Sequence, residues 1–376
     1  LVHFVEAFMG VCPFDANSHV LFSFAIIFDG HVLNLYPTFA AGGALHAFQK
    51  HYLLERAGEI MTQYQINSVQ CTPSALAAIP TAVASQTQIR SIMVGGESMP
   101  KQLMESWTPA VPHFINAYGP TESAVAVSVM RCNGDMQYPT SIGTPLCNVR
   151  AFIVDPQDIS TLQPPGVPGE LVVAGQQVGR GYMNLPEQTA KSFVQSPFDP
   201  PESEHGRMYR TGDLCRWLPD GTIGYMGRID QQVKLRGYRI ELGEIESVLL
   251  GHESVGLCAV TLRAGDSGGG QSAFLAAYVE LSDTVDDVDE DQLRSELAAV
   301  AASKLPQYMV PSTFTVLAQM PQTTSGKIDR KKLPEPATQD WLASGGGRLS
   351  GGEFVAPATA VEVWLAGHFV SVLGLA

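Results

Sequence analysis

The stretch VPHFINAYGPTE, residues 111–122, shows where an apolar run meets a turn of small residues. The earlier stretch SIMVGGE, residues 91–97, follows the same plan. In α/β sheets a turn of this kind lies at the carboxyl edge of a strand, where ligands bind. We therefore predict an α/β fold with a ligand site at the ends of these two strands.

The turn itself carries groups that suit a nucleotide. Tyr118 offers a flat ring for stacking, Thr121 a hydroxyl for phosphate, and Glu122 a carboxylate for Mg²⁺. A plain Gly-Pro turn followed by a helix cap would contain the same residue types. By itself this stretch leaves both interpretations open.

Composition narrows the class of protein. The 376 residues are 45% hydrophobic, which favours a globular protein of two or three domains. The formal net charge of −14 argues against a nucleic-acid partner and against a membrane surface, because both attract basic faces. The longest apolar run, VLFSFAIIF, is about half of what a bilayer span needs. The six cysteines lack a CxxC pair, which indicates reduced thiols and a cytoplasmic protein. They are Cys12, Cys71, Cys132, Cys147, Cys215 and Cys258.

The pattern of helix and strand signals changes twice along the chain. Short β-rich runs alternate with helical spans up to about residue 148, and the region 149–227 is rich in strands, with Asp220-Gly221 as a hairpin signal. After Gly227 the pattern predicts a compact α+β unit. Its helices are expected over 241–250 and 290–305, and its strands over 255–263, 272–281 and 312–318.

Three further stretches carry polar groups in unusual settings. YRTGDL, residues 209–214, places Asp213 after a Thr-Gly turn, where its carboxylate could accept hydrogen bonds from a ribose diol or cap its own backbone. GRIDQQVKLRGYRIELGEIE, residues 227–246, mixes cationic side chains with glycines, although a solvated charge run is the usual explanation of such a segment. GELVVAGQQVGRGYM, residues 169–183, has glycines at strand ends, which favours a structural role.

Taken together and in order, these stretches resemble the adenylation domain of nonribosomal peptide synthetases, a branch of the adenylate-forming enzymes. FDGH (28–31), LPQYMVP (305–311) and SGKIDR (325–330) belong to the same resemblance, which covers essentially the whole chain. It implies an α/β fold with a large subdomain of α/β and β-barrel-like parts, present only in part, and a small α+β C-terminal subdomain. The expected boundaries are 1–229, 230–335, a linker over 336–353, and the start of a truncated carrier domain over 354–376.

The resemblance also implies a reaction and a set of nucleotide contacts. Members of this family join a carboxylate to ATP, release pyrophosphate, and pass the acyl group to a thiol. Tyr118 would stack on adenine, Thr121 would touch phosphate, and Glu122 would hold Mg²⁺. The remaining residues of the implied ATP and AMP site are Asn116, Ala117, Gly119, Asp213 for the ribose, Tyr225 and Arg228.

Three positions are assigned to the moving part of such an enzyme. By resemblance Lys327 bridges the substrate carboxylate and the α-phosphate, where its charge stabilises the forming adenylate. Asp230 is the expected hinge, and the loop around Gly237 is expected to face the phosphopantetheine thiol after the small subdomain rotates. The implied cofactors are ATP, Mg²⁺ and a phosphopantetheine carried on a carrier domain.

The amino-acid site follows from the same correspondence. Asp29 matches the carboxylate that pairs with the substrate ammonium. The lining that this implies is mostly apolar, so we expect a neutral, hydrophobic or aromatic amino acid whose side chain hydrogen-bonds Gln70. The expected lining residues are Asp29, Gly30, Leu33, Gln70, Met93, Gly95, Ala117, Val125 and Ala126, together with Lys327.

Two departures from the family pattern shape the expectation. The Ser/Thr/Gly-rich phosphate loop is missing upstream of Asp29, and no serine that could bear phosphopantetheine follows the linker. We therefore expect a fragment that is inactive alone, whose parent works with carrier and condensation domains. An acyl- or aryl-CoA ligase and a non-catalytic remnant are the alternatives.

Overall fold

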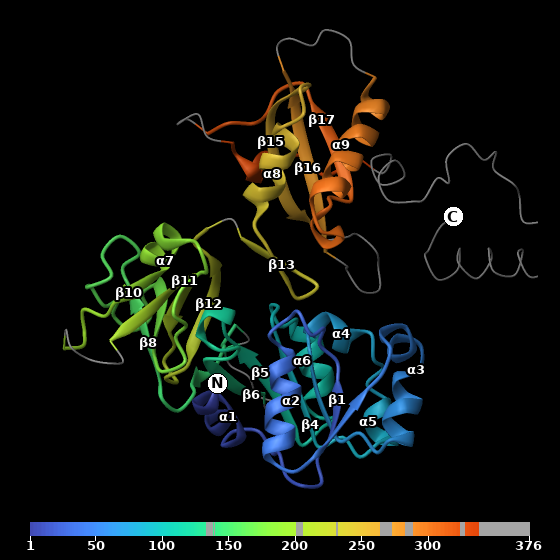
Figure 1. The fold of residues 1–376 in the computed structure, drawn as a ribbon, viewed down its shortest axis with the longest axis vertical. Helices are drawn as coiled ribbons and strands as arrows, with labels where there is room; N and C mark the ends of the chain where they lie inside the picture. The colour runs from blue at the N-terminus through green and yellow to red at the C-terminus, as the bar shows by residue number, and fades with distance from the viewer. Residues whose placement is uncertain are drawn as a thin grey trace, which may run out of the picture. The chain divides into compact units, whose positions relative to one another are not determined.

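A computed structural model describes residues 1–132, 138, 140–200, 206–230, 232–263, 273–282, 289–323 and 328–337. Lys327, nearly all of the expected linker and the expected carrier segment lie outside these ranges. The chain divides into two compact units, Leu1–Asp230 and Gln231–Ala376, next to the boundary expected from the sequence. Each unit is described by itself (Figure 1).

The first unit is built on a seven-stranded sheet with the order β2-β1-β3-β4-β5-β6-β7. Strands β1 to β5 are parallel, and β6 and β7 run antiparallel to their neighbours. The order 2-1-3-4-5 is that of a doubly wound sheet, whose switch point lies between β1 and β3. The strands are β1 (His19–Phe22), β2 (Ala44–Ala47), β3 (Ser68–Cys71), β4 (Ser91–Gly95), β5 (His113–Tyr118), β6 (Ser128–Cys132) and β7 (Thr144–Pro145).

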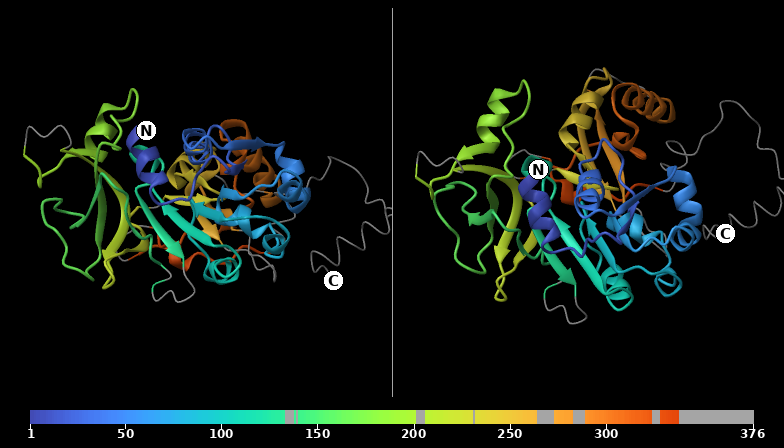
Figure 2. Two further views of the ribbon diagram at one scale, coloured as in Figure 1. Left: turned by 90° about the horizontal axis from the view of Figure 1, so that it is seen from below. Right: turned by 60° about the horizontal axis from the view of Figure 1, so that its bottom comes forward.

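Helices connect these parallel strands and pack on the sheet, as the two views of Figure 2 show. Strands β3 and β4 read SVQC and SIMVG and are buried almost throughout, as expected for strands covered on both faces. One cluster between sheet and helices includes Ile92, Trp107 and Phe114. The helices of this unit are α1 (Val2–Met9), α2 (His31–Ala40), α3 (Lys50–Gln63), α4 (Pro73–Ala77), α5 (Val83–Gln86), α6 (Lys101–Trp107), η1 (Thr121–Ser123) and α7 (Pro186–Ser192).

A second, antiparallel sheet completes the first unit. Its order is β10-β11-β9-β8. Strand β12 also pairs with β11, on the edge opposite β9. The predicted hairpin at Asp220-Gly221 joins β11 and β12, with Gly221 at φ +81°. The strands are β8 (Val149–Val154), β9 (Gly169–Gly175), β10 (Phe193–Gln195), β11 (Arg207–Trp217) and β12 (Ile223–Arg228).

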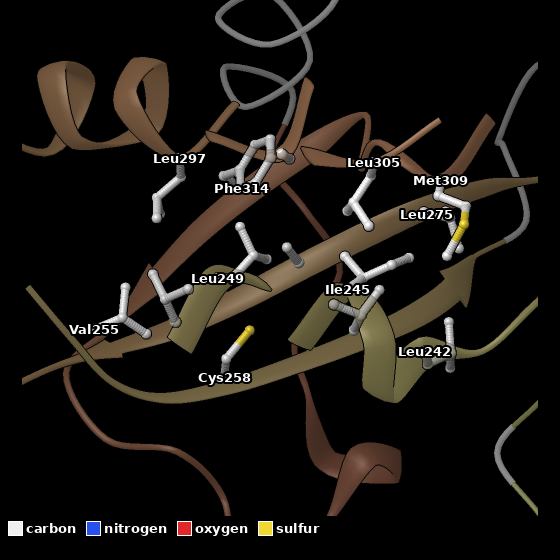
Figure 3. Close-up of a cluster of buried hydrophobic side chains, with 14 of the residues drawn as sticks. Leu242, Ile245, Leu249, Val255, Cys258, Leu275, Leu297, Leu305, Met309 and Phe314 are labelled. Atoms are coloured by element: carbon white, nitrogen blue, oxygen red, sulfur yellow. The ribbon is translucent and has the colours of Figure 1, made fainter. Parts of the chain in front are cut away.

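The second unit contains the predicted α+β pattern. In its three-stranded sheet β15 and β16 are antiparallel and β16 and β17 are parallel, and a short hairpin of β13 and β14 precedes it. Apolar residues of both helices meet the sheet in a buried cluster that includes Leu249, Leu297 and Phe314 (Figure 3). The elements are β13 (Val233–Leu235), β14 (Tyr238–Ile240), α8 (Leu242–Leu250), β15 (Val255–Arg263), β16 (Phe274–Leu281), α9 (Glu290–Lys304), η2 (Gln307–Met309), β17 (Thr313–Leu317) and η3 (Arg330–Lys332).

Two expectations from composition can be compared with the structure. None of the helices in the described ranges is both long and apolar enough to cross a bilayer. All six cysteines are free thiols, and Cys147 is the exposed one. Burial raises the pKa of the Cys71 thiol to about 12, so this thiol stays protonated at neutral pH.

Candidate nucleotide-binding site

The loop after β5 folds back tightly on itself. The Val127 amide donates a 2.8 Å hydrogen bond to the carbonyl of Tyr118, the last residue of the strand. A Cβ on Gly119 would lie 2.5 Å from both the Val125 carbonyl oxygen and the Ala126 Cα. Only glycine fits at this position, so the Gly-Pro turn in the sequence is a requirement of the loop.

Asp213 is presented by a bulge within a strand. Arg210 pairs with Val172 of β9 and Leu214 pairs with Glu170, so the Thr-Gly-Asp segment bulges away from β9. The sequence predicted a turn here, but the segment lies inside β11 because strands on both sides continue the pairing. A bulge re-aims a side chain, and in this case it re-aims a buried carboxylate.

The bulge is held by hydrogen bonds to a buried acid. The Gly212 amide donates to Glu170 Oε1 at 3.2 Å, and Glu170 Oε2 accepts from Arg210 Nη2 at 2.6 Å. The Thr211 hydroxyl donates to the Leu171 carbonyl at 2.7 Å and accepts from the Asp213 amide at 3.0 Å. The backbone around Asp213 is therefore fixed before any ligand arrives.

Asp213 joins residues from three parts of the first unit. Its Oδ2 accepts a short hydrogen bond from the Tyr118 hydroxyl, and its Oδ1 accepts from Arg228 Nη1 at 3.1 Å. A carboxylate has about four acceptor positions, so it can bind several donors at the same time. The structure thus brings together Tyr118, Asp213 and Arg228, which the sequence analysis placed at one nucleotide site.

The two tyrosine rings of the expected site lie side by side. The ring centroids of Tyr118 and Tyr225 are 6.3 Å apart with an interplanar angle of 45°. Burial raises the pKa of both phenols, and the Asp213 carboxylate raises it further. Both phenols are therefore neutral at physiological pH and act as hydrogen-bond donors or stacking surfaces.

Arg228 links Asp213, the carboxylate expected to bind the ribose, to Asp230, the expected hinge residue. Its Nε donates to Asp230 Oδ1 at 2.8 Å and its Nη2 donates to Asp230 Oδ2 at 2.5 Å, which is a bidentate pair. Its Nη1 also donates to the Thr211 carbonyl at 2.8 Å. Asp230, the last residue of the first unit, is therefore tied to the same network as Asp213.

Glu122 is held by a segment 60 residues further along the chain. Its Oε1 accepts a 2.7 Å hydrogen bond from the Tyr182 hydroxyl, and its backbone carbonyl accepts one from the Gly179 amide at 2.7 Å. Sequence reasoning assigned residues 169–183 a structural role and missed this contact. The signal was the isolated tyrosine in Gly-Arg-Gly-Tyr, but the distance in sequence hides its partner.

Five of the residues expected to line the amino-acid site belong to one hydrophobic cluster. Leu33, Met93, Ala117 and Ala126 are buried there together, with Val125 packed against them. Gly95 pairs with Ala117 across β4 and β5, and a Cβ on Gly95 would lie 2.6 Å from the Ala117 carbonyl oxygen. Gly30 is buried beside Phe24 and Phe28, whose rings would clash with any Cβ.

The two polar residues of that lining flank the switch point of the sheet. Asp29 lies in the turn between β1 and α2, and Gln70 lies near the end of β3. Ligands of doubly wound sheets bind outside the carboxyl ends of the strands at such a point. Gln70 is buried and already bonded on both side-chain atoms: its Oε1 accepts from Asn34 and its Nε2 donates to Ser68, at 2.8 and 2.7 Å.

The remaining assigned residues belong to the second unit. Gly237 lies in the turn between β13 and β14 at φ +82°, and the preceding Arg236 is also left-handed at φ +51°. Lys327 is outside the described residues. The flanking chain is defined, because the Asp329 amide donates to the Pro321 carbonyl at 2.7 Å and Arg330 pairs with Glu246 at the same distance.

The residues at hand suit a nucleotide with a hard cation. A buried carboxylate at Asp213 lies beside two neutral phenol rings, and these are the group types that suit a ribose next to a flat base. Mg²⁺ is commonly bound by one or two carboxylates with phosphates supplying further oxygens, so Glu122 alone suffices as its protein ligand. The arrangement can therefore orient a nucleotide between the β5 loop and the β11 bulge.

Comparison with known proteins agrees with this geometry. The AMP-binding enzyme model matches residues 1–183, and the model of the AMP-binding enzyme C-terminal domain matches residues 244–327. Tyrocidine synthase 2 from Brevibacillus parabrevis is 37% identical over 371 residues, which are 98% of this chain and 10% of that protein. The chain thus spans about a tenth or less of the first curated relatives that it matches.

Solved structures show the same fold. The four-domain nonribosomal peptide synthetase AB3403, bound to AMP and glycine, is 30% identical with a TM-score of 0.56, over all of this chain and 26% of that one. The o-succinylbenzoate CoA synthetase from Bacillus subtilis has a TM-score of 0.71 at 21% identity, over 88% of this chain and 64% of that one. The second likeness concerns the fold alone.

The two family models together span well over half of the sequence, and the chain belongs to the AMP-binding enzyme family. Its α/β architecture is the adenylate-forming fold expected from the sequence. The relatives named above include peptide synthetases, which confirms the resemblance to the adenylation domains of nonribosomal peptide synthetases.

Proposed function

We propose that the protein is part of a nonribosomal peptide synthetase module that activates an amino acid with ATP, forming an aminoacyl adenylate, and passes it to a carrier thiol. The observation that carries this proposal is the hydrogen bond from Tyr118 to Asp213, which joins the β5 loop to the β11 bulge. That bond brings the two halves of a nucleotide site together within one unit. A CoA ligase shares the fold, but the relatives by sequence are peptide synthetases.

Each residue of the site has a defined task in this proposal. Tyr118 stacks on the adenine, with Asn116 and the backbone of Ala117 at its edge. Asp213 accepts the ribose hydroxyls, with Tyr225 and Arg228 nearby. Thr121 donates to phosphate, and Glu122 holds the Mg²⁺ that neutralises charge on the phosphates. Gly119 allows the loop to fold back on Val125 and Ala126, because no side chain fits there.

The second unit supplies the mobile part of the proposed cycle. Lys327 stabilises the charge on the substrate carboxylate and the α-phosphate while the adenylate forms. Rotation at Asp230 then removes Lys327 and brings the Gly237 turn toward the phosphopantetheine thiol. Asp230 forms an ion pair with Arg228 within the first unit. We expect a movement of the hinge to change this ion pair.

The proposed substrate is a neutral, hydrophobic or aromatic amino acid. Asp29 would pair with its ammonium group, since a partly buried carboxylate gains most from an opposite charge. The apolar cluster of Leu33, Met93 and Ala126 would receive its side chain. Asn34 and Ser68 already hold Gln70, so a substrate hydrogen bond there would use its second donor or acceptor position.

The proposed partners follow from the reaction. The carrier and condensation domains of a peptide synthetase, in the cytoplasm, would receive the aminoacyl group through phosphopantetheine. The proposal includes no nucleic-acid and no membrane partner, in keeping with the acidic charge of −14.

Pyrophosphate exchange with ATP tests the proposal on the parent synthetase, because this chain by itself is expected to be inactive. We expect exchange with neutral hydrophobic or aromatic amino acids, and none with fatty or aryl acids. Exchange only with fatty or aryl acids would support the CoA ligase, and no exchange with any acid would support the non-catalytic remnant.

A single substitution separates the two half-reactions. Lys327→Ala should abolish adenylate formation and spare thiol transfer from a preformed aminoacyl adenylate. An equal loss of both half-reactions would contradict the role assigned to Lys327.

A further inference from the structure

The segment of residues 179–182 binds Glu122 through two hydrogen bonds. The Gly179 amide binds the Glu122 backbone carbonyl, and the Tyr182 hydroxyl binds the Glu122 carboxylate, each at 2.7 Å. One contact fixes the position of the residue, and the other fixes the direction of its side chain. A glutamate side chain has several staggered rotamers, and the hydrogen bond from Tyr182 favours one of them for Glu122 on the 3₁₀ turn η1.

Residues 179–182 are themselves held by contacts with neighbouring parts of the first unit. The Tyr182 amide donates to Thr189 Oγ1 at 2.9 Å, and Thr189 in turn donates to the Tyr182 carbonyl at 3.3 Å. The Tyr182 ring packs edge-on against Phe193, with centroids 5.3 Å apart. Arg207 Nη1 donates to the carbonyl of Arg180 at 2.7 Å. Both the backbone and the ring of Tyr182 are therefore held in place.

We propose that Tyr182 is a positioning residue that orients the Glu122 carboxylate for the nucleotide-bound cation. The proposal rests on the proposed function, in which Glu122 holds Mg²⁺. A carboxylate has several acceptor positions and the Tyr182 hydroxyl uses one of them on Oε1, so the same group can accept this bond and bind a cation. A hydrogen bond to a charged group is also stronger than one between neutral groups, which makes the preference for one rotamer substantial.

The rival explanation is that Tyr182 only packs the segment against the second sheet. Tyr182→Phe keeps the ring and its contact with Phe193, and removes the hydroxyl alone. Phe193→Leu does the reverse, because it disturbs the packing and keeps the hydroxyl. A packing role predicts that Phe193→Leu has the larger effect on ligand binding, and a positioning role predicts the opposite.

The experiment measures ATP binding by titration calorimetry on the intact protein, with and without Mg²⁺. The gain in ATP affinity on adding Mg²⁺ should fall roughly tenfold in Tyr182→Phe, as expected for a hydrogen bond to a charged group. Phe193→Leu should lower the melting temperature and leave that gain within about twofold of wild type. In a Glu122→Gln background, Tyr182→Phe should have little further effect on the gain from Mg²⁺, because the anionic cation ligand that Tyr182 orients is already lost.

The outcomes separate this inference from the function on which it rests. Wild-type protein whose ATP affinity does not depend on Mg²⁺ would contradict the proposed function. Wild-type protein with a Mg²⁺-dependent affinity that Tyr182→Phe leaves unchanged would overturn the positioning role alone. Equal effects of Tyr182→Phe with and without Glu122→Gln would overturn it as well.

Discussion

Gly212 shows how closely one backbone position is tied to Asp213, the carboxylate that we propose binds the ribose. It has φ +69°, and a Cβ there would lie 2.7 Å from Arg228 Nη2 and 3.1 Å from Asp230 Oδ2. The missing side chain leaves room for the guanidinium that binds both Asp213 and Asp230. Conformational freedom and space are therefore required at the same residue.

Gly212→Ala should weaken ATP binding and lower the free energy of unfolding by about 1–3 kcal/mol, because it adds backbone strain and displaces Arg228. Gly221→Ala is the matched control, since Gly221 has φ +81° but nothing lies within 4 Å of its Cβ position. The control should lose stability through strain alone and keep the affinity for ATP. Chemical denaturation and ATP titration of both variants make the comparison. Equal ATP affinities for the two variants would exclude a steric role for Gly212.

At the level of elements, the parallel pairing of β1 and β2 brings two histidines together. His46 Nε2 lies 3.2 Å from His19 Nδ1, and the rings stack with centroids 5.2 Å apart. The ring of Tyr64 is the other aromatic neighbour of His46, at 5.8 Å. Burial lowers the pKa of His46 below 6.5, and a charge on His19 lowers it further.

This pair should make the stability of the first unit depend on pH. Because the pKa of His46 is lower in the folded state, the unfolded state binds more protons near pH 6.5. The contribution of His46 is present above that pH and is lost as the pH falls through the folded-state value. Denaturant midpoints between about pH 5 and pH 8 should fall toward acid in wild type and change less in His46→Gln. Identical pH slopes for the two proteins would show that His46 plays no part.

The elements also show what the sequence could and could not predict. Strand β5 and its turn, helix α8 and the hairpin at Asp220 were predictable, because apolar periodicity and turn residues are local signals. The bulge at Asp213 was not, since pairing with both β9 and β12 turns an apparent Thr-Gly turn into a strand. The contact of Tyr182 with Glu122 was missed for the same reason, because only the folded chain brings their segments together.

At the scale of the whole molecule, each unit has a hydrophobic core of its own. The cluster around Leu249 contains residues of the second unit only, and the cluster around Phe114 residues of the first. Units with separate cores behave as separate folding domains. The hydrogen bonds of Asp213 with Tyr118 and Arg228 lie within the first unit, and Lys327 lies outside the described residues.

Leu249→Ala should therefore destabilise one unit selectively. Leu249 is fully buried, and truncation of a buried leucine costs about 2–5 kcal/mol. Leu250→Ala is the matched control, because its side chain on the same helix is 44% exposed. Calorimetry should show one transition shifted to lower temperature in Leu249→Ala, the other unchanged, and neither displaced by the control. A joint shift of both transitions would mean that the units unfold as one.

The division at Asp230 also leaves the two units uninterrupted along the chain. Every strand of the seven-stranded sheet lies before residue 146, so the ribosome has finished that sheet before it begins the second unit. At about 5–20 residues per second, translation of the second unit takes on the order of ten seconds, far longer than most small domains need to fold. The nucleotide network can therefore form on the nascent chain, and newly made protein should gain affinity for ATP before its synthesis is complete.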